Sequence, residues 1–501
     1  MLNFRTLSRL LIGNYPSNSS LVLCGEDRLF DNGLTMGSLY IGGQGTGKTT
    51  ALARHLVDYM KKYPNRAIFV LDWSGSITDS LLSIIMDDES HDKLLKRVIY
   101  DQLGNTEWVV PLPEFSSEYG GTYEDHIQRV VDNFKKLSPE LIANAPLLGG
   151  LAVSEIAPHF FRLLTATTND SIDQNETWQI TETKKLLVDK ALLRKLITKY
   201  GSKVPETAWY LNQEYLSQDI KASERELRTY ALRSVLNITD IREVKARLGY
   251  YHPGWTPREA IEKGKLVIVD GAKLIDQTAS QYYLFTQAFS LIMAEIKHRR
   301  PTNPNDEPVS LVLDEVRSLM AIPGMANELS SLAPQYRSRK LQLYVVMQEL
   351  SQMSEELRPH IWSLGNIVCF AMSNFDEAYE IAQQLFRYEP RLERIPATNQ
   401  RQRPIMENDR GQSLIIANWL QQLKKRECVM RRMVTEQERD ALVRHVPQTM
   451  NVTLNNNQAL LNELKDELMR KRSVRIHDAL ELINRRHKLP ETRPQSPPTV
   501  T

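Results

Sequence analysis

Cysteine is scarce in this sequence, which has 3 among 501 residues. Cys24, Cys369 and Cys428 are far apart and odd in number, so they match neither a disulfide framework nor the CxxC spacing of a zinc site. The 10 histidines show no metal-ligand cluster either. The sequence therefore indicates neither a disulfide-stabilised fold nor a Cys/His metal centre.

Long apolar runs are also missing, since none approaches the ~20 residues needed to span a bilayer. The opening stretch, MLNFRTLSRLLIGNYP, has too short an apolar segment for a cleaved signal peptide. We therefore expect a cytoplasmic protein with no transmembrane segment of its own. An excess of one charge sign is absent as well, because 63 basic and 61 acidic residues give a net charge of +2. Any nucleic-acid contact must come from locally concentrated positive charge.

What is present is the composition of a folded protein, with 42% hydrophobic and 25% charged residues. Short apolar runs typical of strands alternate with helical patterns, which predicts an α/β fold with a mostly parallel sheet. The runs that we assign to strands are 37–41, 67–71, 97–100, 108–110, 265–270, 309–313, 341–347, 366–370 and 427–433.

One long stretch between these runs lacks strand patterns. From Tyr123 to about Arg247 the apolar residues recur at helical spacing, which indicates an all-helical insertion. The length of the chain corresponds to roughly three domains. We expect residues 1–118 and 248–436 to form two parts of one α/β core, 119–247 a helical insertion domain, and 437–501 a helical, basic tail with a Pro-rich end.

The most specific motif follows the first predicted strand. This segment matches GxxxxGK[ST] and lies between a strand and a helical pattern, the context of a phosphate-binding P-loop. Its glycines let successive backbone N–H groups surround phosphates at a helix N-terminus. Lys48 would reach the β- and γ-phosphates, and the hydroxyl of Thr49 would bind Mg²⁺. The predicted ATP-binding residues are Gly42, Gly43, Gln44, Gly45, Thr46, Gly47, Lys48, Thr49 and Thr50.

A second motif is the apolar run 309–313 followed by two acids. This is a Walker B pattern, in which Asp314 would hold Mg²⁺ and Glu315 would orient and deprotonate the attacking water. Many buried strands end in acidic residues, so this pattern alone is weak evidence and becomes strong evidence only together with the P-loop. The two motifs together favour a hydrolase, since a Glu beside the Mg²⁺ acid is what switch GTPases usually lack.

Three weaker signals surround these motifs. Gln348 ends the strand 341–347, where it would sense the γ-phosphate or lie as an ordinary surface residue. Arg337 precedes that strand and could stabilise transition-state charge in a neighbouring subunit, although a solvated basic turn is as good an interpretation. Asp72 ends the strand 67–71, where it could bond water at the nucleotide site or cap a turn.

The order of these motifs resembles that of the FtsK/HerA superfamily of DNA-pumping ATPases. Within it, the chain is most similar to the TraD/TraG-type coupling proteins of conjugation and type IV secretion, over about residues 34–435. The resemblance implies a RecA-like P-loop NTPase core, an inserted all-α domain and a hexameric ring that threads DNA. It also implies that Gln348 is the sensing glutamine and Arg337 the trans-acting arginine, with Arg339 as a near neighbour.

The sequence departs from this family in two ways. It shows no N-terminal membrane anchor, so membrane association would need an anchoring or secretion-channel partner. It also has too few residues before the P-loop for the N-terminal β-barrel of HerA-type proteins.

We therefore expect an ATP-driven DNA translocase of conjugation or a related transfer. Two alternatives stay open: a HerA-like DNA-pumping ATPase in repair or phage defence, and a nucleotide-gated receptor that recruits substrates to a secretion system. A candidate DNA surface is residues 421–501, which contain 16 Lys and Arg against 10 Asp and Glu. A solvated helix face is the competing interpretation.

Overall fold

The computed structural model describes a large part of the chain, and the statements below concern that part. The described residues are 37–137, 152–168, 177–217, 222–274, 278–299, 301, 306–320, 329, 338–353, 358–362, 364–385, 392–393, 405–406, 409–433, 441–446 and 457–486. The chain divides into two compact units. The core unit comprises residues 1–101, 258–275 and 296–468, and the helical unit comprises 102–257, 276–295 and 469–501.

The core unit is built on a nine-stranded sheet. Six neighbouring strands, β8, β1, β7, β6, β2 and β5, run parallel, while β11 and β12 are added antiparallel at one edge. In spatial order the strands are β12 (Ala441–Val446), β11 (Cys428–Met433), β8 (Asn366–Phe370), β1 (Ser38–Ile41), β7 (Leu341–Met347), β6 (Val309–Leu313), β2 (Ile68–Asp72), β5 (Leu266–Asp270) and β3 (Val98–Gln102).

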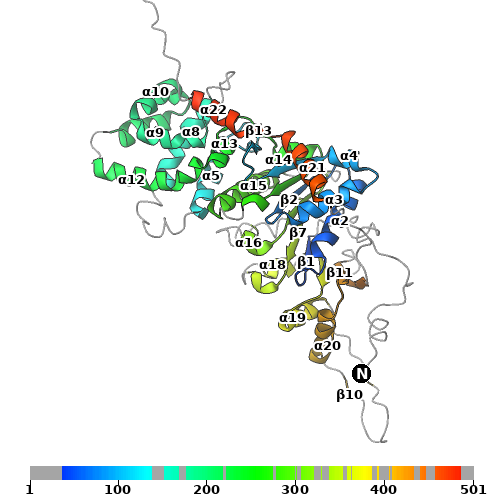
Figure 1. The fold of residues 1–501 in the computed structure, drawn as a ribbon. Helices are drawn as coiled ribbons and strands as arrows, with labels where there is room; N and C mark the ends of the chain where they lie inside the picture. Colours follow the sequence, from blue (N-terminus) through cyan, green and yellow to red (C-terminus); the bar gives the residue numbers. More distant parts are fainter. Residues whose placement is uncertain are drawn as a thin grey trace, which may run out of the picture. The chain divides into compact units, whose positions relative to one another are not determined.

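The parallel strands are short, apolar and buried along their whole length, as in sheets with helices on both faces. Helices α2 and α3 pack against each other, and so do α19 and α20 (Figure 1). The helices of the core unit are α2 (Lys48–Lys62), α3 (Ser76–Met86), α4 (His91–Leu95), α14 (Pro257–Glu262), α16 (Val316–Met320), α18 (Arg358–Trp362), α19 (Phe375–Leu385), α20 (Asp409–Gln421) and α21 (Gln458–Arg470). Its smaller elements are η8 (Ala272–Leu274), η10 (Leu350–Gln352), β9 (Leu392–Glu393) and β10 (Ile405–Met406).

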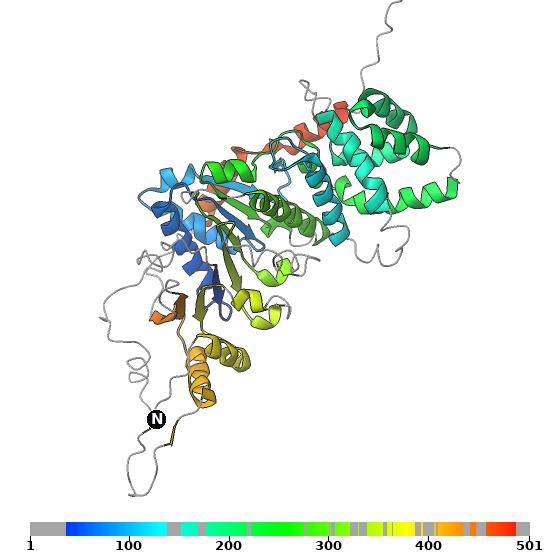
Figure 2. The ribbon, with the colours of Figure 1, turned by 180° about the vertical axis from the view of Figure 1, so that it is seen from behind.

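The helical unit is a bundle, seen in cyan to green in Figure 2. A two-stranded ribbon, β4 (Trp108–Val109) with β13 (Val474–Arg475), belongs to the same unit. Its helices are α5 (Tyr123–Leu137), η2 (Ala152–Ile156), α8 (Ala157–Thr168), η4 (Ile180–Glu182), α9 (Thr183–Val188), α10 (Lys190–Tyr200), η5 (Gly201–Lys203), α11 (Pro205–Tyr210), η6 (Leu211–Tyr215), α12 (Ala222–Val235), η7 (Leu236–Asp240), α13 (Arg242–Gly249), α15 (Thr278–His298) and α22 (Ile476–Arg486).

The predicted mostly parallel α/β sheet is confirmed. One element differs, because residues 441–446 form β12 although the sequence predicts a helical tail from residue 437. The segment pairs along its length with β11, and periodicity within a single segment does not report such a distant partner. The division into four sequence segments stays a prediction. The helical unit also contains residues 276–295 and 469–501, which the sequence assigns to the core and the tail.

Candidate functional site

The P-loop leaves the carboxyl end of β1 and turns sharply into α2. Gly42 has φ of 151°, and a Cβ at this position would lie 2.7 Å from Cβ of Phe370. The N–H of Gly43 donates to the carbonyl of Ala371 at 2.7 Å. Only glycine combines this backbone angle with such a close approach, so the glycine of the motif lets the loop pack against the end of β8.

Lys48 points back into this loop. It is 7% exposed, and its Nζ donates to the carbonyls of Gly42 at 2.6 Å and Gly43 at 2.7 Å. Burial lowers the pKa of Lys48 to about 8, although Asp314 nearby acts in the opposite direction. The ammonium group is thus held on the concave side of the loop.

The N-terminus of α2 has the properties of an anion site. Its N-cap is Gly47, with φ of 109°, which has no side chain to accept from the first N–H groups of the helix. The first turn carries no acidic residue. A Cβ at Gly45 would meet nothing within 4 Å, so the outer side of the loop is open. Unsatisfied donors, the helix dipole and the Lys48 ammonium together fit a polyphosphate.

Asp314 follows β6 and is 2% exposed. Its Oδ2 accepts from the hydroxyl of Ser76 at 2.9 Å. Burial raises the pKa of Asp314 to about 6, while the Ser76 hydrogen bond and the positive charge of Lys48 lower it. The carboxyl group therefore lies in an environment that disfavours its charge unless a cation compensates it.

Glu315, the predicted base, is half-buried and has φ of 51°. This left-handed backbone is uncommon for a residue with a long side chain, and such conformations concentrate at functional sites. Its carbonyl accepts from the N–H of Ser318 in the first turn of α16. The strain thus falls at the residue that the Walker B pattern marks as catalytic.

Strand β7 lies between β1 and β6 and so separates the strands that carry the two Walker motifs. Gln348 follows β7 directly and is exposed, at the same sheet edge as Lys48 and Asp314. Arg337 lies outside the described residues. Its neighbour Arg339 precedes β7, at the opposite end of that strand from Gln348, and donates from Nη1 to the carbonyls of Lys297 at 2.6 Å and Arg299 at 2.7 Å, so it has a structural role there. Thr49 and Thr50 are half-buried in the first turn of α2.

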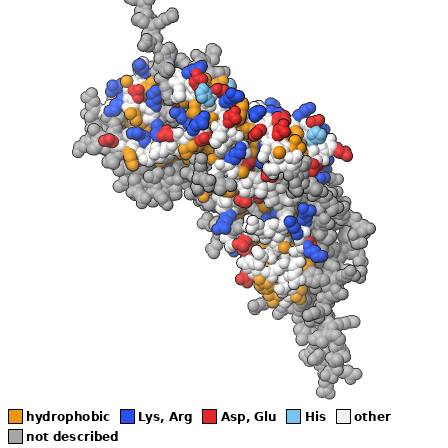
Figure 3. Space-filling view, viewed as in Figure 1, with side chains coloured by type: hydrophobic (Ala, Val, Ile, Leu, Met, Phe, Trp, Pro, Cys, Tyr) orange, Lys and Arg blue, Asp and Glu red, His pale blue; other side chains and the backbone are white. Residues whose placement is uncertain are grey.

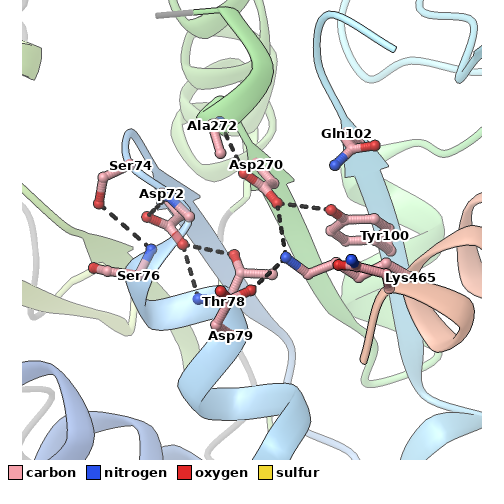
Figure 4. Close-up of polar contacts among 12 residues, drawn as sticks. Asp72, Ser74, Ser76, Thr78, Asp79, Tyr100, Gln102, Asp270, Ala272 and Lys465 are labelled. Atoms are coloured by element: carbon pink, nitrogen blue, oxygen red, sulfur yellow. Dashed lines mark hydrogen bonds and ion pairs between the residues drawn. The ribbon is translucent and has the colours of Figure 1, made fainter. Parts of the chain in front are cut away.

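Asp72, an ambiguous residue in the sequence, caps α3. Its Oδ1 accepts from the N–H of Gly75 at 2.8 Å, and its Oδ2 accepts from the N–H and hydroxyl of Thr78 at 2.8 and 2.6 Å (Figure 4). Burial first, and then the charges of Asp314 and Asp270, raise the pKa of Asp72. The turn-capping interpretation therefore holds, and the cap places Ser76 beside Asp314.

The sequence gives no sign of a second buried carboxylate beside Asp72. Asp270, at the end of β5, accepts from the hydroxyl of Tyr100 at 2.7 Å and lies 3.8 Å from Nζ of Lys465 (Figure 4). Lys465 also pairs with Asp79 in the first turn of α3. These contacts attach α21 to the sheet edge that carries the P-loop. These contacts join residues hundreds of positions apart, so no local sequence motif predicts them.

Several basic residues of the predicted DNA surface have structural roles. Arg486 is 3% exposed and pairs with Glu182, and Arg475 lies over the ring of Trp108. Arg485 pairs with Glu481 on the surface of α22. On the face in Figure 3, basic and acidic side chains are interspersed. Arg486 therefore belongs neither to a DNA surface nor to a solvated helix face, and a DNA surface elsewhere in the tail stays a prediction.

None of the helices in the described ranges combines the length and hydropathy that crossing a bilayer requires. Within the same ranges, no group of three or more His, Cys, Asp or Glu could hold a metal ion. A Mg²⁺ site of the P-loop type is compatible with this, since Mg²⁺ usually takes one or two protein ligands together with phosphates and waters.

Neither a comparison with protein-family models nor one with curated proteins gives a match. Among solved structures, the chain is similar to the bacterial conjugative coupling protein TrwBdeltaN70 in its unbound monoclinic form, with a TM-score of 0.50, 14% identity and coverage of 91% of this chain and 92% of that chain. It is also similar to the plasmid coupling protein TrwB in complex with ADP and Mg²⁺, with a TM-score of 0.52, 13% identity and coverage of 91% and 95%.

At these identities the likeness concerns the fold. The chain has the fold of conjugative coupling proteins, which confirms the predicted RecA-like P-loop core with an added helical unit. The roles of the individual site residues remain predictions.

Proposed function

We propose that the chain is an ATPase whose P-loop binds ATP with Mg²⁺. The observation that carries this proposal is the arrangement of Lys48 inside a glycine loop at an uncapped helix N-terminus, with the buried Asp314 close enough to influence its pKa. Backbone N–H groups of residues 43–47 and the Lys48 ammonium would hold the phosphates. Thr49 and Asp314 would hold the Mg²⁺. The plasmid coupling protein TrwB, which has a similar fold, is solved in complex with ADP and Mg²⁺, and this supports the choice of nucleotide and metal.

A bound Mg²⁺ would supply positive charge that offsets the buried carboxylate and the phosphate oxygens. Glu315 would hold the attacking water in line with the γ-phosphate and accept a proton from that water. Gln348 would contact the γ-phosphate or that water from the end of β7. Arg337 of a neighbouring subunit would stabilise charge that develops in the transition state, which is worth ~10³–10⁵ in rate for such arginines.

The proposed work of this ATPase is DNA translocation in conjugation or a type IV secretion-like transfer. The similarity of fold to the coupling protein TrwB supports this context. We propose a homo-oligomeric, hexameric ring that moves DNA and contacts a secretion-channel or membrane-anchoring partner. Recruitment of protein substrates without DNA movement is the alternative that the experiment below separates from it.

The deciding experiment measures steady-state ATPase activity with no DNA, with single-stranded DNA and with double-stranded DNA. Lys48→Ala is the blank, because it removes the ammonium from the loop. Stimulation of the ATPase activity by one form of DNA supports the translocase function and identifies the form of DNA that it moves. Activity that depends on Lys48 but is indifferent to DNA favours the recruitment alternative. Equal activity in wild type and Lys48→Ala contradicts the ATPase assignment.

Glu315→Gln tests the catalytic step separately. The amide keeps the shape of the side chain but cannot accept the proton, so the variant should bind ATP and hydrolyse it at least about 100-fold more slowly. Nucleotide binding and phosphate release are measured on the same sample. Full hydrolysis by this variant would remove Glu315 from the base role.

A further inference from the structure

The turn before β11 lies directly on the P-loop. The backbone N–H of Arg426 donates to the carbonyl of Thr46 at 2.8 Å. A Cβ at Gly47 would lie 3.2 Å from Cγ of Arg426 and 3.5 Å from its Cα. Because Gly47 is the N-cap of α2, the side chain of Arg426 starts beside the positive end of the P-loop helix.

Contacts on both sides fix the position of this turn. The N–H of Lys424 donates to Oε2 of Glu427 at 2.7 Å, and the N–H of Glu427 donates to the carbonyl of Lys424 at 3.0 Å. The next residue, Cys428, is buried and pairs with Phe370 in β8. Strand β8 pairs in turn with β1, which leads into the P-loop. The turn and the loop are therefore held by neighbouring strands of one sheet.

The backbone of Arg426 has φ of 67°. Glycine or asparagine adopts this left-handed conformation at lower cost, and long side chains in it are uncommon outside functional sites. Lys424 and Lys425 on the same turn are exposed, whereas Arg426 is half-buried against the loop. A strained backbone thus places the one arginine of a basic turn beside Gly47, the N-cap of the P-loop helix.

The chemistry of the guanidinium suits this place. The N–H groups of a P-loop cradle the α- and β-phosphates, and the loop lysine reaches the β- and γ-phosphates. An arginine beside Gly47 would lie closest to the α- and β-phosphates. The N–H donors of its guanidinium group match the spacing of phosphate oxygens. A polyphosphate bound at this loop would compensate the positive charges of both Arg426 and Lys48.

We infer that Arg426 contacts the α- or β-phosphate of the nucleotide bound by its own chain, a contact made with ADP and ATP alike. The inference rests on the proposed nucleotide site and adds a residue that no Walker motif contains. It separates two arginines by role: Arg426 acts within its own chain and stabilises the bound state, whereas Arg337 is proposed to act in a neighbouring subunit during hydrolysis.

The test is binding of ADP with Mg²⁺ by isothermal titration calorimetry to wild type, Arg426→Gly and Lys425→Ala. Glycine removes the side chain, keeps the N–H that donates to Thr46 and accepts a φ of 67°, so the turn is preserved. We expect Arg426→Gly to bind ADP roughly 10- to 100-fold more weakly, the effect of losing one charge-assisted hydrogen bond. Lys425→Ala removes the same charge from the same turn and should stay within about twofold of wild type.

Arg426→Lys extends the test, since it should recover part of the lost affinity by charge without the bidentate fork. Thermal unfolding of Arg426→Gly at wild-type temperature or above shows that the turn still folds. The inference is overturned if Arg426→Gly binds ADP within twofold of wild type, or if Lys425→Ala loses as much affinity. Lys48→Ala separates the two proposals: the nucleotide site itself fails only if wild type and Lys48→Ala bind ADP equally.

Discussion

Replacing Arg486 by methionine should destabilise the helical unit strongly at neutral pH. Arg486 and Glu182 both have fully buried side chains, and Nη1 of the arginine lies 3.4 Å from Oε1 of the glutamate. The second oxygen of Glu182 already accepts from the N–H of Gln179 at 2.8 Å and the hydroxyl of Thr181 at 2.9 Å. Methionine fills the space of the arginine stem but leaves the carboxylate buried without its counter-charge.

Breaking a buried pair by removing one partner costs about 3–5 kcal/mol. Burial raises the pKa of Glu182 and the charge of Arg486 lowers it, so the variant should shift that pKa further upward. A carboxyl group whose pKa is higher in the folded than in the unfolded state stabilises the fold at low pH, where the group is protonated. This contribution to the free energy of unfolding is lost as the pH rises through the pKa of the folded state. The defect of Arg486→Met should therefore be large at pH 8 and shrink towards pH 5.

The assay is hydrogen exchange of peptides from residues 177–188 and 476–486, followed by mass spectrometry in the full chain. Arg485→Met is the matched control, because its partner Glu481 lies one turn away and both side chains are at least half exposed. That variant should change stability by less than about 0.5 kcal/mol. The double variant Arg486→Met/Glu182→Gln should recover most of the loss. Equal effects of the two arginine replacements, or no recovery in the double variant, would refute the reasoning.

Three further predictions concern the core unit. Ser76→Ala removes the donor to Asp314, so the Mg²⁺ concentration for half-maximal ATPase activity should rise roughly 3- to 10-fold, with Ser80→Ala as an unaffected control. Burial lowers the pKa of His55 to about 4, so this group alone should cost wild type about 1.4 kcal/mol of unfolding free energy per pH unit between pH 6.5 and pH 4, and His55→Phe should lack this loss; parallel pH profiles by urea denaturation would contradict this. Arg337→Ala should bind nucleotide without hydrolysing it, and mixing in Lys48→Ala subunits should restore activity; an absence of restoration argues against action in trans.

The sequence predicts the parts of this site that depend on local order. Lys48 and Asp314 each come after a short apolar strand. When both strands are buried in one parallel sheet, the two residues lie at the same edge, at the carboxyl ends of its strands. Parallel strands meet at that edge, which is why motifs far apart in the chain converge there. The fold class follows for the same reason.

The contacts that tune the site could not be predicted, because each joins distant segments. Ser76 and Asp314 are 238 positions apart, Lys465 and Asp79 are 386 apart, and Arg426 reaches Thr46 from beyond β8. A serine, a lysine or an arginine carries no periodic pattern of its own, so only the folded chain shows its partner. The basic tail shows the opposite error. Its composition predicts a DNA-binding surface, but one of its arginines, Arg486, is buried in the helical unit.

The central position of β1 has a consequence for synthesis of the protein on the ribosome. Its residue Ser38 pairs with Tyr344 and Asn366, so neither neighbouring strand exists until most of the chain has been made. At translation rates of about 5–20 residues per second, β1 waits roughly 15–60 s for β7. During that time an apolar strand and its glycine loop have no neighbouring strand to pair with. Nascent chains of this protein should therefore need chaperone protection until β7 and β8 have emerged.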